Sequence, residues 1–236
     1  MLSVLMGRLK LEAIRMALRV THKLLPKFIK YFKFLDLNLF IPYGIFNPTY
    51  TLSTELMLRN IRPKGRVADV GCGSGAIAIY IAKNFRVEEV IAYDVNPKAL
   101  ATSLINARLN GVDGKIRFVS SVEELREVGE VDYVVTNPPY LPLEPRDELD
   151  ISWCGGEDLR SLKEVVRLGC EILRGGGVLA LTTSSTAGID RVMRYLRSLG
   201  LKPRVAAVAR TPADTIYLVL ALKIKWLTCY LLSSRI

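Results

Sequence analysis

The sequence is poor in the side chains that most often hold metals or form covalent cross-links. Its 236 residues include four cysteines and a single histidine. Cys72, Cys154, Cys170 and Cys229 form no C-x-x-C pair and show no metal-ligand spacing with His22. These absences argue against a disulfide framework and against a zinc site. We therefore expect reduced thiols and no bound metal.

The sequence also has no uninterrupted run of about 20 apolar residues, the length that a membrane-spanning helix needs. Residues 216–232 come closest, but Lys223 and Lys225 interrupt them. Near the first residue, apolar side chains alternate with Arg8, Lys10 and Glu12, so no secretory signal is evident. We expect a cytoplasmic protein with no membrane contact.

Acidic residues are outnumbered, with 23 Asp and Glu against 33 Lys and Arg, a net charge of +10. Such a charge suggests an acidic partner such as RNA, although a basic proteome or a thermophilic surface would also account for it. Residues 1–35 contain Glu12 as their one acid, and their apolar residues recur at near-helical spacing. Pro26 predicts a break into two short helices. This basic stretch either contacts RNA or a partner, or caps the ligand pocket described next.

A glycine-rich turn follows the first expected strand, residues 67–70, and precedes an expected helix at 76–84. Gly71, Gly73 and Gly75 permit a tight turn and let a ligand approach the backbone. The amide groups that open the following helix can receive polar ligand atoms. The stretch predicts a pocket for a nucleotide-type cofactor.

Strands and helices alternate through most of the chain, which predicts a doubly wound, mostly parallel, Rossmann-like α/β sheet of seven strands. The last strand is expected to be antiparallel, because residues 210–214 form a hairpin turn. We expect a basic helical N-terminal extension at 1–45, one α/β domain at 46–225 and an apolar tail at 226–236. The further expected strands are 90–93, 116–119, 131–136, 178–183, 205–209 and 215–222, and the helices are 53–60, 97–110, 161–173 and 189–199.

Two cofactors compete for the glycine turn. Gly71-x-Gly73-x-x-Ala76, with Asp94 near the expected offset for a ribose-binding acid, fits a dinucleotide fingerprint. Asp69 at the strand end changes the balance, because it would repel a pyrophosphate but suits the cationic sulfonium of S-adenosylmethionine.

The sequence Asn137-Pro138-Pro139-Tyr140 follows the fourth expected strand, at the sheet edge where ligands bind. The Asn137 side-chain oxygen and the Pro138 carbonyl can each accept one N–H of a substrate NH₂ group, which orients its lone pair toward a methyl donor. The prolines stiffen the loop, and Tyr140 can stack on a flat substrate group. We expect these four residues to be catalytic.

Residues 69–75, Asp94 and residues 137–140 together resemble class I S-adenosylmethionine-dependent methyltransferases of the amino-methylating type, over residues 50–225. Trp153-Cys154-Gly155-Gly156 downstream resembles the HemK-type (PrmC-like) glutamine N5-methyltransferases, in their archaeal and eukaryotic branch. This resemblance implies methylation of the glutamine in the Gly-Gly-Gln loop of a class I translation release factor, and a small zinc-binding activator protein as a partner. The cofactor-binding residues it implies are Thr54, Asp69, Gly71, Cys72, Gly73, Gly75, Asp94, Val95, Ser121, Val122 and Asn137, and the substrate-binding residues are Asn137, Pro138, Tyr140 and Trp153.

Three positions depart from the family pattern. Ser53 stands where an acid is expected, Ser121 replaces the acid that usually meets the adenine amine, and Leu159 replaces a glycine. The motif at 137–140 also serves base-methylating enzymes, so an rRNA or tRNA base N-methyltransferase is the alternative, favoured by the basic N-terminal stretch. A protein lysine methyltransferase and a non-catalytic cofactor-binding scaffold are further alternatives, but a mere scaffold would not need residues 137–140. A DNA adenine methyltransferase is disfavoured, since no target-recognition domain is evident.

Overall fold

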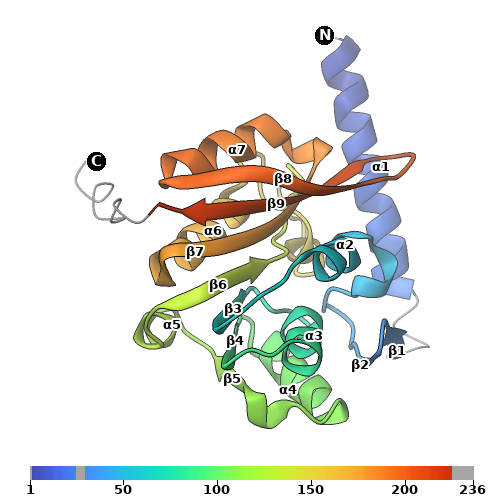
Figure 1. The fold of residues 1–236 in the computed structure, drawn as a ribbon. Coiled ribbons are helices and arrows are strands. Elements are labelled where there is room, and N and C mark those ends of the chain that lie inside the picture. The colour runs from blue at the N-terminus through green and yellow to red at the C-terminus, as the bar shows by residue number, and fades with distance from the viewer. Residues whose placement is uncertain (1, 25–29, 225–236) are drawn as a thin grey trace.

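The computed structural model describes residues 2–24 and 30–224, with only the backbone for residues 2–5, 23 and 24. Its centre is a seven-stranded sheet in the order β5-β4-β3-β6-β7-β9-β8 (Figure 1). The strands are β3 (Arg66–Val70), β4 (Glu89–Tyr93), β5 (Ile116–Val119), β6 (Val131–Thr136), β7 (Leu173–Ser184), β8 (Leu201–Arg210) and β9 (Thr215–Lys223).

The pairing of the strands confirms the predicted sheet. β9 runs antiparallel to both β7 and β8, whereas the pairs β3–β4, β3–β6, β4–β5 and β6–β7 are parallel. Parallel neighbours need a crossover connection, and helices supply it here. One face of the sheet is covered by α2 (Ser53–Asn60), α3 (Ala76–Asn84) and α4 (Pro97–Leu109), and the other by α5 (Val122–Glu127), α6 (Arg160–Ile172) and α7 (Ile189–Ser198).

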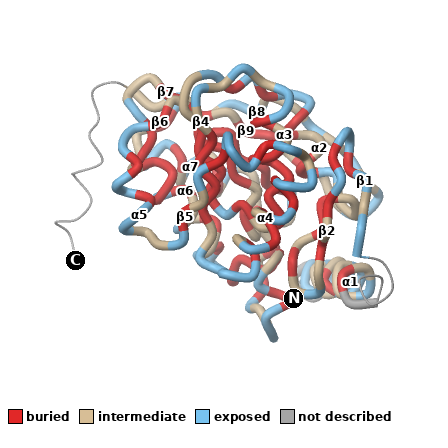
Figure 2. Tube along the Cα trace, turned by 90° about the horizontal axis from the view of Figure 1, so that it is seen from below, coloured by how far each residue is buried: buried red, intermediate tan, exposed pale blue. Residues whose placement is uncertain are grey.

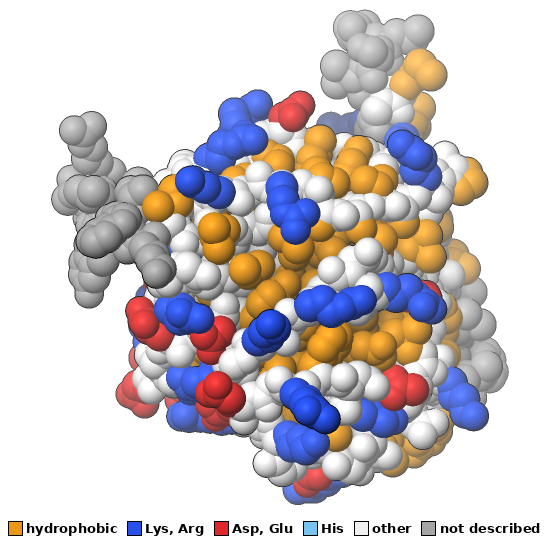
Figure 3. Space-filling view, viewed as in Figure 1, with side chains coloured by type: hydrophobic (Ala, Val, Ile, Leu, Met, Phe, Trp, Pro, Cys, Tyr) orange, Lys and Arg blue, Asp and Glu red, His pale blue; other side chains and the backbone are white. Residues whose placement is uncertain are grey.

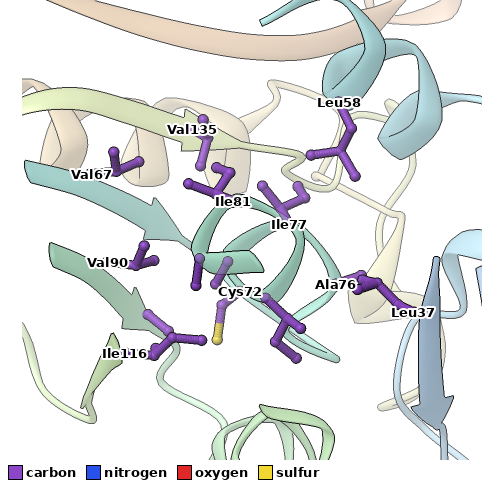
Figure 4. Close-up of a cluster of buried hydrophobic side chains, with 14 of the residues drawn as sticks. Leu37, Leu58, Val67, Cys72, Ala76, Ile77, Ile81, Val90, Ile116 and Val135 are labelled. Atoms are coloured by element: carbon purple, nitrogen blue, oxygen red, sulfur yellow. The ribbon is translucent and has the colours of Figure 1, made fainter. Parts of the chain in front are cut away.

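The central strands are buried on both faces, which is why they are nearly continuous apolar runs. Val67 of β3 joins the cluster beneath α2 and α3, while Ala68 and Val70 join the cluster beneath α6. Figure 4 shows Val67, Val90 and Val135 on the strands facing the helix residues Ile77 and Ile81. Figure 2 shows the buried residues concentrated between the two helix layers, with α1 at the margin of the molecule. The sheet and its two helix layers therefore form the scaffold for the ligand-binding edge.

The N-terminal region differs from the sequence prediction. Residues 2–24 form one helix, α1 (Leu2–Leu24), and a β-hairpin of β1 (Tyr31–Phe34) and β2 (Leu37–Phe40) follows. The prediction of a second helix before residue 35 is therefore wrong, because residues 31–34 form β1. Pro26 lies outside the described residues. The Asn106 side chain accepts the Phe40 N–H at 2.6 Å and donates to the Phe40 carbonyl at 2.9 Å. A tertiary contact with α4 thus satisfies the edge of β2, and local sequence patterns do not report such a contact.

Smaller differences concern boundaries. Helix α2 has the expected bounds, and Leu52 occupies the cap position directly before Ser53. The strand expected at 178–183 begins five residues earlier, because β7 starts at Leu173. Helix α5 was not predicted. The expected tail at 226–236 lies outside the described residues, and no helix in the described part is long and apolar enough to cross a membrane. The short 3₁₀ segments are η2 (Pro48–Tyr50), η3 (Asp113–Lys115), η4 (Asp150–Ser152) and η5 (Ser185–Ala187).

Candidate active site

The two sequence motifs meet at the carboxyl edge of the sheet. β3 leads into the glycine turn and β6 leads into residues 137–140, and these two strands are hydrogen-bonded neighbours with Asp69 opposite Val135. Parallel neighbours end at the same edge, so the turn and the 137–140 loop lie next to each other. The site therefore has two adjoining parts, the glycine turn and a cavity in front of Asn137.

The glycine turn uses its three glycines in two ways. All have positive φ, at 82° for Gly71, 55° for Gly73 and 79° for Gly75, a region that glycine enters without a steric penalty. A Cβ at Gly71 or Gly73 would meet no atom within 4 Å, whereas a Cβ at Gly75 would lie 2.2 Å from the Ser103 Oγ. The first two glycines leave open backbone for a ligand, and the third allows α3 to pack closely against α4.

Asp94 at the end of β4 lies across from the glycine turn. Its Oδ2 accepts the Gly73 N–H at 2.9 Å, and its Oδ1 accepts the Asn96 N–H at 2.9 Å. Each oxygen keeps a second lone pair, so the carboxylate can also accept ribose hydroxyls. The next side chain, Val95, is 70% exposed and offers an apolar surface to a flat ring. Open glycines, an acceptor carboxylate and an exposed apolar side chain together fit the nucleoside part of S-adenosylmethionine.

Removing the Asp94 carboxylate is expected to weaken the binding of S-adenosylhomocysteine about 10- to 100-fold, because hydrogen bonds to a charged acceptor contribute about 1.5–3 kcal/mol. Isothermal titration calorimetry of Asp94→Ala measures this loss. Asp113→Ala is the matched control. Asp113 is exposed and lies in η3, which follows the end of α4 that is far from Asp94. An Asp94→Ala affinity equal to that of the control would refute the assignment.

Asp69 lies beneath the glycine turn and is fully buried. Its Oδ2 accepts the Ala78 N–H at 3.0 Å, and its Oδ1 has no hydrogen-bond partner among the described residues. Burial raises the pKa of Asp69 to about 7. Through this hydrogen bond the carboxyl group connects the end of β3 with the start of α3. Because Asp69 is buried, it would attract a sulfonium through the glycine turn and not by direct contact.

The raised pKa of Asp69 predicts a pH-dependent stability. The folded state holds this proton up to about pH 7, while the unfolded chain releases it near pH 4. The free energy of unfolding therefore decreases as pH rises from about 4 through about 7, by up to ~4 kcal/mol. In urea unfolding, Asp69→Asn should gain stability relative to the wild type over this interval. Parallel pH curves for the two proteins would contradict the prediction.

Three predicted cofactor residues use their side chains elsewhere. The Cys72 side chain belongs to the core cluster drawn in Figure 4, and burial raises its pKa. The Ser121 Oγ accepts the Glu124 N–H at 3.1 Å and thereby caps α5. Val122 packs partly into the core on the α5 side of the sheet. A cofactor role for Cys72, Ser121 and Val122 stays a prediction. For Cys72 it would involve only the backbone, since the side chain lies in the core.

The Asn137 side chain is held by hydroxyl groups from two other elements. Its Nδ2 donates to the Ser53 Oγ at 3.1 Å and to the Thr54 Oγ1 at 3.3 Å, both on α2. Its Oδ1 accepts the hydroxyl of Thr182 on β7. Thr54, predicted to bind the cofactor, and Ser53 thus orient the amide here, and sequence reasoning missed Thr182 altogether. The Oδ1 retains a lone pair for a substrate N–H.

Asn137, Pro138 and Tyr140 line a cavity of about 610 Å³. Burial raises the pKa of Tyr140 to about 12, so the phenol is neutral at physiological pH. Trp153 lines the same cavity and is 5% exposed. The charged lining residues are Lys33, Glu55 and Asp214. The cavity has the size of a small-ligand site and a mainly apolar wall.

The loop after β6 brings Trp153 back to this cavity. The Leu141 N–H donates to the Trp153 carbonyl at 2.8 Å, and the Gly155 N–H donates to the Leu141 carbonyl at 2.9 Å. A Cβ at Gly155 would lie 2.5 Å from the Pro139 carbonyl oxygen, so a glycine is needed for this approach. Leu159, in place of the family's glycine, adopts a left-handed conformation at φ 62° and is buried. Residue 159 therefore has the left-handed backbone conformation that glycine favours, although it is a leucine.

The arrangement provides paired acceptors at a rigid loop and no strong base. The described residues include no group of three or more His, Cys, Asp and Glu side chains that could hold a metal ion. Such a site suits the transfer of a group to a nitrogen that needs alignment more than deprotonation.

Comparisons with known proteins agree with this geometry. The family described as "Methyltransferase small domain" matches residues 44–199. The chain is 30% identical over 160 residues to "Putative protein N5-glutamine methyltransferase MJ0928" of Methanocaldococcus jannaschii, covering 65% of this chain and 79% of that protein. It is 28% identical over 187 residues to "Release factor glutamine methyltransferase" of Clostridium botulinum, covering 72% of this chain and 66% of that protein. The mouse "Methyltransferase HEMK2" is 28% identical over 146 residues, covering 58% of this chain and 68% of that protein.

The match does not extend over the whole length of most relatives, and the chain spans about half (49%) of a release factor glutamine methyltransferase of Deinococcus radiodurans. Solved structures share the fold at low identity. They include Trm5b of Pyrococcus abyssi, with a TM-score of 0.58 and 17% identity over 84% of this chain and 57% of that one. TrmK of M. capricolum, in complex with S-adenosyl-homocysteine, has a TM-score of 0.55 and 15% identity over 73% of this chain and 68% of that one.

Proposed function

Because the chain belongs to the methyltransferase small domain family, we propose that it transfers a methyl group from S-adenosylmethionine to the side-chain amide of glutamine in the Gly-Gly-Gln loop of a class I release factor. The observation that carries this proposal is the Asn137 amide, which Ser53, Thr54 and Thr182 orient in the lining of a cavity that Trp153 also lines. The names of the relatives from M. jannaschii and C. botulinum support the same substrate class.

Gly71, Gly73 and Asp94 would hold the nucleoside, and the bound cofactor supplies a methyl group on a cationic sulfonium. An amide nitrogen is a weak nucleophile because its lone pair is delocalised. The Asn137 oxygen and the Pro138 carbonyl accept its two N–H groups, which fixes the nitrogen in one orientation and stabilises the positive charge that develops on it. The neutral Tyr140 phenol packs beside the amide, and the excess proton passes to water. No protein base is required.

The charge of the cavity favours a protein substrate over RNA. Glu55 and Asp214 outnumber Lys33 in its lining, and a polyphosphate backbone near two carboxylates would be repelled. Two cations of the basic N-terminal stretch have acidic partners within the chain, because Arg15 pairs with Glu12 and Asp150, and Arg19 pairs with Asp147 and Asp150. A release factor as substrate also implies a cytoplasmic location.

An RNA base N-methyltransferase is the second candidate, because the net charge is +10. Figure 3 shows Lys and Arg side chains spread over one face of the molecule, among apolar side chains and with few acids except at its lower left. Such a face could bind RNA outside the cavity.

Labelled methyl transfer distinguishes the two candidates. Purified chain is incubated with labelled S-adenosylmethionine and release factor, its Gln→Ala variant in the Gly-Gly-Gln loop, or bulk RNA, each with and without a small zinc-binding activator protein. We expect label in the release factor and none in its Gln→Ala variant. Label in RNA alone would overturn the proposal, and label in both release factors would move the acceptor to another residue, such as lysine. A requirement for the added protein would identify it as the expected activator.

A further inference from the structure

Helix α1 lies outside the residues that match the family, yet it packs directly on the loop that follows the 137–140 motif. One face of the helix is buried against this loop and the other is exposed. The cluster between them is formed by Leu11, Ile14 and Leu18 of α1 with Leu141, Leu143, Leu149, Trp153 and Cys154 of the loop.

Ion pairs reinforce this contact. Asp150 is fully buried, and its Oδ1 accepts the Arg19 Nη1 at 2.7 Å, while the Arg15 Nη1 lies 3.7 Å from its Oδ2. Arg15, itself 3% exposed, also donates to the Glu144 carbonyl at 2.8 Å. A buried carboxylate with two arginine partners is a fixed arrangement, because breaking it would leave buried charges unpaired.

The backbone carbonyl of the same aspartate is hydrogen-bonded to the tryptophan that lines the cavity. The N–H groups of Trp153 and Cys154 donate to the Asp150 carbonyl at 3.1 and 2.7 Å. The His22 ring near the end of α1 packs on Trp153 with ring centroids 5.0 Å apart. The helix and the cavity wall are therefore one packed unit.

Ile14 and Leu18 also line the cavity itself, which Asn137, Tyr140 and Trp153 line as well. An apolar wall of this kind stabilises a bound ligand when an apolar group of that ligand is buried against it. It does not favour the binding of a phosphate group.

We propose that α1 forms part of the substrate site and that Ile14 and Leu18 are specificity-determining residues. They contact an apolar side chain of the protein substrate that lies close to the methylated glutamine. Arg15 and Arg19 are positioning residues, because they act through Asp150 on the loop. This inference rests on the proposed function, since it assumes that a protein segment enters the cavity.

The exposed face of α1 supplies matched controls. Leu9 and Met16 lie on the same helix and are 62% and 59% exposed. Steady-state methylation of release factor is measured for Leu18→Ala and Ile14→Ala against Met16→Ala and Leu9→Ala, together with the affinity for S-adenosylhomocysteine. We expect the KM for release factor to rise about 10-fold in the first pair, with kcat within about threefold, and no change in the second. Affinity for S-adenosylhomocysteine should be equal in all four variants.

A conservative variant separates recognition from folding. Leu18→Met keeps the volume and apolar character of the side chain and should restore most of the wild-type KM. Equal KM values in all four alanine variants would overturn the inference while leaving the proposed function intact. A loss confined to kcat, or one that Leu18→Met does not rescue, would also overturn it. If the wild type binds S-adenosylhomocysteine but does not label release factor, the proposed function fails, and this inference fails with it.

Discussion

Asn137→Ala should lower the rate of methyl transfer by roughly 10²- to 10³-fold, the range found when one preorganised polar group that stabilises developing charge is removed. The loss should appear in kcat, because in the proposed mechanism the Asn137 oxygen accepts an N–H of the nitrogen on which positive charge develops. Binding of S-adenosylhomocysteine should persist, since the glycine turn and Asp94 are unchanged. Single-turnover labelling of release factor, with calorimetry for cofactor binding, measures both quantities. Normal turnover would refute the mechanism.

Two neighbouring threonines on β7 provide a sharper test of the same site. The Thr182 hydroxyl donates to the Asn137 Oδ1, whereas the buried Thr183 Oγ1 has no hydrogen-bond partner among the described residues. Thr182→Val should reduce kcat, because the amide loses one of its fixed contacts, and Thr182→Ser should retain it. Thr183→Val should leave kcat unchanged. A similar loss in Thr182→Val and Thr183→Val would show that the effect comes from packing and not from the orientation of Asn137.

Asp150→Ala is expected to destabilise the fold by about 3–5 kcal/mol, because it leaves the buried Arg15 and the largely buried Arg19 without their shared carboxylate. Equilibrium unfolding in urea measures the change. The Asp147 side chain also pairs with Arg19 at 2.7 Å but is 45% exposed. Asp147→Ala should therefore cost no more than about 1 kcal/mol.

The outcome that contradicts this prediction is an equal loss in the two variants, since α1 would then be held by its exposed contacts. If Asp150→Ala is the more damaging, the near-ultraviolet circular dichroism of the native protein should also change, because the variant loses the Arg15 and Arg19 contacts that hold the η4 segment directly before Trp153.

The predictions that the structure confirms rest on short segments. The helix Ala76–Asn84 and the strand Val131–Thr136 have the expected bounds, and each follows from apolar periodicity and flanking turn residues. The positive φ values of Gly71, Gly73 and Gly75 agree with the reason for which glycine was expected there. The placing of Asn137 beside the glycine turn follows from the rule that parallel neighbours end at one edge.

The sequence by itself thus determined the sheet, the antiparallel last strand and the two motifs at its edge, because these depend on residues close together in the chain. The tertiary structure alone decided which groups hold those motifs. Asn137 is oriented by Ser53 and Thr182, from positions 84 and 45 residues away, and Asp150 by Arg19 across 131 residues. In the sequence, the basic N-terminal residues indicate only a positive charge. In the folded chain, Arg15 and Arg19 contact acidic residues of a distant loop. Side-chain contacts over such separations leave no periodic pattern in the sequence, so the role of α1 emerges only when the chain is folded.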